Sequence, residues 1–152
     1  MNIWLLTHTE ELKKSTGTGK IVKDTLGMAC KIVEWSRVAP DQRILDLDPN
    51  NTLLVYSNNE AEITSCDKSL ATVQNIIIID GTWQQAQKMY NKSPYLKKFG
   101  HYEICGLKSV YNKRRNQKAF GLCTVEVAIY LLNEIKHPLT STLQSKFDEF
   151  NQ

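Results

Sequence analysis

The sequence lacks paired cysteines, a long apolar run and a strong excess of either charge. Its four cysteines are widely separated, with no C-x-x-C pair and no histidine at ligand spacing, so we expect reduced thiols and no bound metal. These cysteines are Cys30, Cys66, Cys105 and Cys123. The longest apolar stretch, within residues 125–132, is too short to span a bilayer, and no signal peptide precedes residues 2–8. These absences predict a cytoplasmic protein.

The length of the chain limits the number of domains, and the distribution of charge limits the class of partner. With 152 residues, of which 41% are hydrophobic, the chain can bury the core of one domain, residues 1–152, but not of a second. The net charge of +3 alone does not indicate nucleic-acid binding. Residues 108–118, however, contain five basic and no acidic side chains, which makes Lys113, Arg114 and Arg115 candidate RNA contacts. A solvated surface loop is the alternative interpretation.

Short apolar segments alternate with segments rich in helix formers along most of the chain. This order is typical of parallel β-α-β units and predicts an α/β fold, a three-layer sandwich with a mostly parallel sheet. The expected strands are residues 2–7, 29–35, 52–56, 76–79 and 101–105, and the expected helices are residues 19–26, 83–90, 122–136 and 139–150.

Residues 74–90 form the most informative unit of the sequence. Four consecutive isoleucines, residues 76–79, predict a strand buried on both faces, and Asp80 follows it. A Gly-Thr turn then leads into a helix that begins at Trp83. Because ligands of α/β proteins bind at the carboxyl ends of the strands, Asp80 is a candidate for chemistry. Alternatively, Asp80 serves the turn, and Thr82 with Gln85 is a capping box.

Two helix starts offer further candidate sites. The segment Ser15 to Lys20 suggests a phosphate loop, but a Walker A motif needs Ser or Thr after the lysine, and Ile21 stands there. We therefore expect Thr18 to be the N-cap of a helix starting at Gly19, whose amides could still hold a phosphate of a ligand. At the start of residues 122–136, Glu126 lies off the apolar stripe of the helix, which predicts either a cap or a ligand contact. The stripe consists of Leu122, Val125, Ala128, Ile129, Leu132 and Ile135.

Two short motifs resemble a known family. Asp80-Gly81-Thr82-Trp83 resembles the D-x-T-W signature of the DTW-domain family, and Cys123-Thr124-Val125-Glu126 resembles its second motif, S-T-x-E. Cysteine stands where the family has serine, and cysteine is a poor cap acceptor, which favours a ligand contact for Glu126. The cysteine-rich, zinc-binding segment that many members carry has no counterpart ahead of residue 1, so we expect no docking by such a segment.

The resemblance implies a SPOUT-like fold with a C-terminal trefoil knot and a reaction that uses S-adenosylmethionine. Members transfer the 3-amino-3-carboxypropyl group to a base in RNA, and the bacterial short form resembles an enzyme that modifies N3 of a uridine in tRNA. An RNA methyltransferase of the same general fold is one alternative. A non-catalytic RNA-binding module, suggested by the basic segment, is the other.

The motif residues can be given roles toward such a uridine. A carboxylate within hydrogen-bond reach can remove the N3 proton or orient the ring, with Asp80 the first candidate and Glu126 the second. Trp83 either stacks on the uracil or packs in the core, and Thr18 and Gly19 are candidate RNA contacts. Amides at strand ends and helix starts are the expected cofactor contacts. These lie at Ser57, Gly81, Thr82, Leu122, Cys123 and Thr124.

Overall fold

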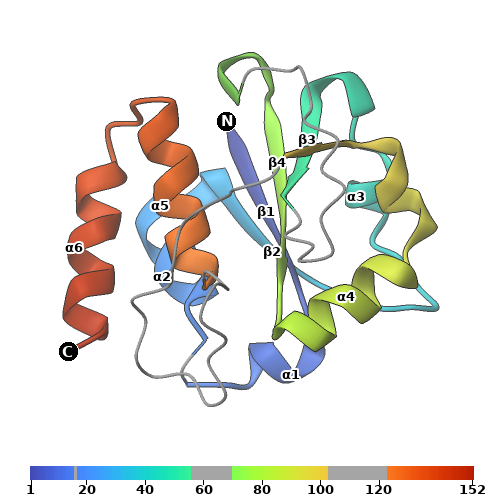
Figure 1. The fold of residues 1–152 in the computed structure, drawn as a ribbon, viewed down its shortest axis with the longest axis horizontal. Coiled ribbons are helices and arrows are strands. Elements are labelled where there is room, and N and C mark those ends of the chain that lie inside the picture. The colour runs from blue at the N-terminus through green and yellow to red at the C-terminus, as the bar shows by residue number, and fades with distance from the viewer. Residues whose placement is uncertain (16, 56–69, 103–122) are drawn as a thin grey trace.

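The computed structural model describes residues 1–15, 17–55, 70–102 and 123–152, and in these ranges five parallel strands form one sheet (Figure 1). The order across the sheet is β2-β1-β4-β3-β5. The strands are β1 (Asn2–Thr7), β2 (Cys30–Glu34), β3 (Thr52–Val55), β4 (Asn75–Asp80) and β5 (Gly100–Tyr102). The α/β class and the parallel sheet are therefore confirmed.

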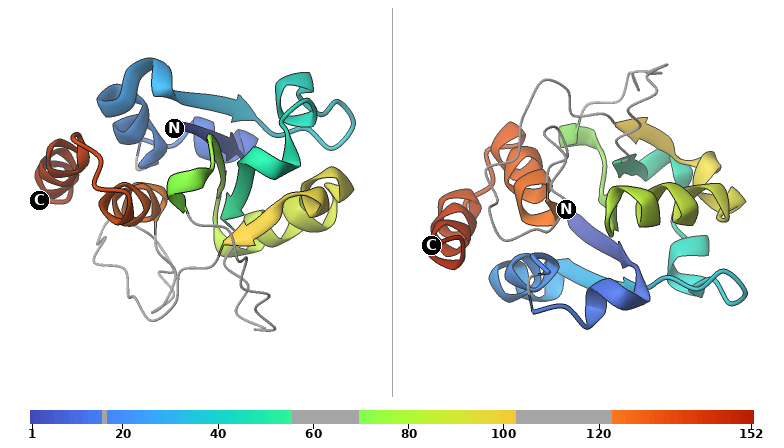
Figure 2. Two further views of the ribbon diagram at one scale, coloured as in Figure 1. Left: turned by 90° about the horizontal axis from the view of Figure 1, so that it is seen from above. Right: turned by 60° about the horizontal axis from the view of Figure 1, so that its bottom comes forward.

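Helices cover both faces of this sheet. The α-helices are α1 (Thr9–Leu12), α2 (Gly19–Leu26), α3 (Gln42–Leu45), α4 (Trp83–Asn91), α5 (Thr124–Glu134) and α6 (Thr140–Phe150). Short 3-10 helices occupy Gly27–Ala29, Pro49–Asn51, Leu70–Thr72 and Pro94–Lys98. Helices α2, α5 and α6 lie on one side of the sheet, and α3 and α4 lie on the other (Figure 1 and Figure 2). This arrangement is compatible with the predicted three-layer sandwich.

Side chains of the central strands point alternately to the two faces of the sheet, which divides the core into two clusters. Ile76 and Ile78 pack with the α2, α5 and α6 side chains, whereas Ile77 packs with Ile44 of α3 and Met89 of α4. Successive side chains of a strand point to opposite faces, so an uninterrupted apolar run is what a strand covered on both faces requires. The isoleucine run of β4 meets that requirement, as the sequence predicted.

The predicted elements agree closely with the described ones, with informative exceptions. β4 is one residue longer at each end than predicted, so Asp80 is the last residue of the strand rather than the first after it. Helix α1 was not predicted. The predicted strand at residues 101–105 overlaps β5, and its last residues lie outside the described ranges. The trefoil knot implied by the resemblance depends on the path of residues 103–122, which also lie outside them.

Helix α5 buries more surface than a single apolar stripe provides. Leu131 is fully buried, although the helical pattern did not select it, whereas Ile129 and Ile135 of the predicted stripe are only partly buried. The reason is that α5 lies between the sheet and α6 (Figure 1), so it is covered on more than one side. Among the helices in the described ranges, none is long and apolar enough to cross a membrane.

Replacing Leu131 with alanine should therefore lower the free energy of unfolding by about 2–5 kcal/mol, the usual cost of truncating a fully buried leucine. Urea denaturation followed by circular dichroism measures this change. Asn133 of the same helix is exposed, and its alanine variant should shift the value by less than about 0.5 kcal/mol. Equal effects of the two variants would contradict the packing described for α5.

Candidate functional site at the ends of β1 and β4

The topology of the sheet changes direction between β1 and β4. The connection from β1 to β2 carries α2 on one face, and the connection from β4 to β5 carries α4 on the other face. β1 and β4 are neighbours in the sheet. Two adjacent parallel strands whose connections leave to opposite faces define a topological switch point, where ligands of α/β proteins bind. Thr7 and Asp80 are paired at this position, because they are the last residues of the two strands.

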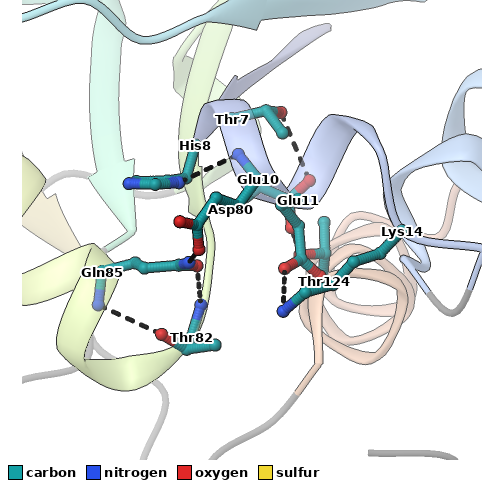
Figure 3. A network of polar contacts seen from close by, with 9 residues as sticks. All are labelled: Thr7, His8, Glu10, Glu11, Lys14, Asp80, Thr82, Gln85 and Thr124. Carbon is teal, nitrogen blue, oxygen red and sulfur yellow. Dashed lines mark hydrogen bonds and ion pairs between the residues drawn. The ribbon is translucent and has the colours of Figure 1, made fainter.

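The carboxylate of Asp80 is buried and held by two threonine hydroxyls (Figure 3). Thr7 Oγ1 shares its one hydrogen between Asp80 Oδ2 and the carbonyl oxygen of Leu5, each 3.2 Å away, and Thr124 Oγ1 donates to Oδ1 over 2.5 Å. Thr7 comes from β1 and Thr124 from the first turn of α5, so three elements distant in the sequence meet at one carboxylate. The side chain of Asp80 is only 6% exposed. Burying a negative charge is costly unless it is hydrogen-bonded, and these hydroxyls supply the bonds.

Two helix N-termini also converge on Asp80. A Cβ atom at Gly19, the first residue of α2, would lie 2.8 Å from Asp80 Oδ2, so only glycine allows this approach. The amide of Val125 in α5 donates to Oγ1 of Thr18 over 3.2 Å, which joins the starts of α2 and α5. The positive ends of two helix dipoles therefore lie beside the carboxylate and stabilise its charge.

The position of Thr18 corrects one expectation. Thr18 is the residue before α2, as predicted, but its hydroxyl makes no capping bond to its own helix. Its backbone is helical, with φ of −91° and ψ of −10°, whereas a capping side chain needs extended backbone at this position. The hydroxyl instead accepts from α5, whose first amides have no partner within that helix. Thr18 is therefore a link between two helices.

The start of α4 is fixed by a local network that the sequence predicted in part. The hydroxyl of Thr82 accepts from the Gln85 amide, and the Gln85 side chain accepts from the Thr82 amide, so the capping box is confirmed. Gln85 Nε2 also donates to Glu10 of α1 over 2.9 Å (Figure 3). His8 Nδ1 accepts from the Glu10 amide, and the His8 amide donates to the Asp80 carbonyl. His8 is thus a hydrogen-bonded histidine.

Glu126 and Trp83 occupy the starts of their helices. Oε1 of Glu126 accepts from the Cys123 amide over 3.0 Å, so this side chain serves as the acidic member of a capping box even with cysteine in the first position. Cys123 is buried and occupies the N-cap position, where the family has serine. Trp83 is half-buried at the first turn of α4, and neither core cluster of the described residues includes it.

A small pocket opens beside Asp80. It lies between α1, the start of α2 and the ends of the strands, and its cavity volume is about 40 Å³. Its lining residues are Thr7, Glu11, Leu12, Gly17, Gly19, Lys20, Ile32 and Asp80. Sequence reasoning selected Asp80 and Gly19 of this group but missed Thr7 and Glu11. Thr7 could have been found, because it ends the first predicted strand and strand ends meet at one edge of a parallel sheet.

Several predicted site residues lie outside the described ranges. These are Ser57 and Leu122, expected at the cofactor, and Lys113, Arg114 and Arg115, expected at the RNA. The structure thus brings Thr18, Gly19, Asp80, Gly81, Thr82, Cys123 and Thr124 to one end of the sheet.

Cys30 and Cys123 are free thiols, and both are buried. Burial raises the pKa of the Cys30 thiol to about 11, so this cysteine is a neutral core residue rather than a nucleophile. Cys66 and Cys105 lie outside the described ranges. Within those ranges no three histidine, cysteine or acidic side chains are grouped so that they could hold a metal ion.

The fold and this site define a class: a parallel α/β protein with a buried carboxylate at the switch point of its sheet. The DTW domain matches the chain over residues 1–152, and the chain belongs to the DTW-domain family. It is similar to the tRNA-uridine aminocarboxypropyltransferase 2 of Drosophila melanogaster, with 31% identity over 140 residues. That alignment covers 86% of this chain and 54% of the fly protein, so the chain spans about half the length of this relative. No solved structure matches the chain.

Replacing Thr124 with valine should lower the free energy of unfolding by about 1–3 kcal/mol, because it removes a hydroxyl donor from a buried carboxylate without changing the shape of the side chain. Thermal or urea denaturation measures the change. Thr142, exposed on α6, provides the matched control, and its valine variant should stay within about 0.5 kcal/mol of the parent. If the two variants were equally stable, Thr124 would not be holding Asp80.

Proposed function

We propose that this protein transfers the 3-amino-3-carboxypropyl group of S-adenosylmethionine to N3 of a uridine in tRNA. The observation that carries the proposal is the buried carboxylate of Asp80 at the switch point, in a chain of the DTW-domain family. The name of the fly relative, a tRNA-uridine aminocarboxypropyltransferase, supports the same reaction. With tRNA as the substrate, we also propose the cytoplasm as the compartment.

In the proposed reaction, N3 of the uridine attacks the carbon that links the amino-acid chain to the sulfonium. The new N–C bond forms as the C–S bond breaks, and methylthioadenosine leaves with the electron pair. The N3 proton passes to Asp80, which acts as the general base, or is lost after Asp80 has oriented the ring. Thr7 and Thr124 keep the carboxylate in one orientation, which is what a proton acceptor at a fixed reaction geometry requires.

The sulfonium activates all three attached carbons, so positioning decides which of them meets the nucleophile. Trp83, half-buried at the first turn of α4, is a candidate platform for the uracil. Lys113, Arg114 and Arg115 remain the proposed phosphate contacts. For Glu126 the capping bond to Cys123 now accounts for one carboxylate oxygen, so Asp80 stays the first candidate for the proton transfer.

The reaction can be tested by incubating the purified protein with unmodified tRNA and S-adenosylmethionine, followed by digestion and mass spectrometry of the nucleosides. The proposal expects a uridine carrying an aminocarboxypropyl group and methylthioadenosine as the by-product. A methylated nucleoside would identify a methyltransferase instead. Salt-sensitive RNA binding with no product from any RNA would indicate a binding module.

Replacing Asp80 with asparagine should reduce the rate of transfer by about 10²–10⁴-fold, because an amide cannot accept the N3 proton. Asparagine is the informative substitution, since it keeps the shape of the side chain and can still hydrogen-bond the two threonines, whereas alanine would leave both hydroxyls without their acceptor. Single-turnover transfer measures the rate. Binding of S-adenosylmethionine and the melting temperature serve as controls. Full activity of the asparagine variant would remove Asp80 from the mechanism.

A further inference from the structure

The pocket beside Asp80 contains a second carboxylate that the proposed reaction has not used. Glu11 of α1 lines this pocket together with Asp80. Its side chain is 16% exposed, and its Oε2 atom is buried and receives no hydrogen bond from the described residues. Lys14 Nζ lies 3.3 Å from the same oxygen (Figure 3), an ion pair without hydrogen-bond geometry, and the Lys14 side chain is 43% exposed.

A buried carboxylate oxygen without a donor is unfavourable, because the loss of its hydration is not compensated. Lys14 places a positive charge near Oε2 of Glu11 but donates no hydrogen bond to it. A cationic group of a ligand in the pocket would supply both the charge and the missing donor. Glu11 therefore points to a ligand that carries an ammonium or a similar cation.

The remaining walls of the pocket limit the ligand further. Lys20 lines the same pocket, so groups of opposite charge, Glu11 and Lys20, border one small space. Gly17 and Gly19 form part of the wall and contribute no side chain; a Cβ at Gly17 would lie 3.2 Å from the carbonyl oxygen of Glu11. The cavity volume of about 40 Å³ is far below that of a pocket for a whole cofactor and leaves room only for a few small groups. It suits the amino-acid end of a larger molecule, which carries an ammonium and a carboxylate.

We propose that Glu11 binds the α-ammonium of the amino-acid end of S-adenosylmethionine, an assignment that rests on the proposed function. Lys20, which also lines the pocket, would then pair with the α-carboxylate. Because Asp80 lines the same pocket, a donor anchored in this way presents the carbon of its amino-acid chain, rather than its methyl group, to the base beside Asp80. Glu11 then determines which group is transferred.

The test compares three ligands by calorimetry: S-adenosylmethionine, its decarboxylated form, which keeps an ammonium, and methylthioadenosine, which lacks the whole amino-acid end. In Glu11→Gln, the affinity for the first two should fall about 10- to 100-fold, as expected for the loss of a charged hydrogen bond, while that for methylthioadenosine stays within about twofold. Two matched controls are Glu10→Gln, an exposed acidic residue of the same helix, and Lys14→Gln, which removes the ion-pair partner of Glu11. Both controls should keep the parent's ratio of affinities for S-adenosylmethionine and methylthioadenosine.

Each outcome decides the assignment. The assignment would be overturned if Glu11→Gln lost affinity equally for all three ligands, or lost none. It would also be overturned if Lys14→Gln showed the same selective loss of affinity. If Glu11→Gln melts before it can be titrated, Glu11→Asp keeps the charge but withdraws it by one methylene, and the same selective weakening is expected. A parent protein that binds none of the three ligands would overturn the proposed function and this assignment with it. If the parent binds S-adenosylmethionine and Glu11→Gln binds it with the same affinity, only the assignment of Glu11 is overturned.

Discussion

The burial of one carboxylate organises this end of the molecule. Asp80 ends the strand β4 inside the protein, where a charge is tolerated only with donors and favourable dipoles around it. Thr7 of β1 and Thr124 of α5 supply the donors, and the N-termini of α2 and α5 supply the dipoles. Two strands and two helices are therefore fixed relative to one another, because each contributes a contact or a dipole to the same carboxylate.

This arrangement explains why fold and proposed chemistry share residues. Thr124 and Gly19 are required for close packing around Asp80, and the same packing gives the carboxylate a single orientation beside the pocket. Residues that hold a buried charge affect stability and activity together, so a loss of activity alone does not assign a catalytic role. The isosteric pairs, asparagine for aspartate and valine for threonine, separate the two effects because they keep the volume and change only the donors or acceptors.

The sequence predicted those features of the site that depend on neighbouring residues. The isoleucine run identified β4, the position of Asp80 followed from the rule for strand ends, and the Thr82–Gln85 box was readable because its members lie three residues apart. It did not predict contacts between distant segments. Thr18 accepts a hydrogen bond from the amide of Val125, 107 positions away. No local sequence pattern could have predicted this bond in place of the expected cap. Glu11 was missed for the same reason: its pocket exists only once α1 lies beside α2 and β4.

The most direct test of the account is hydrogen exchange of the backbone amides with and without S-adenosylmethionine, under conditions where local opening dominates. If the donor binds at the switch point, exchange should slow in three segments that surround Asp80: residues 7–20, residues 80–85 and residues 123–127. Helix α3, Gln42–Leu45, lies on the other face of the sheet and provides the internal reference. Protection centred on α3, or none in the three segments despite measured binding, would contradict the placement of the site at Asp80.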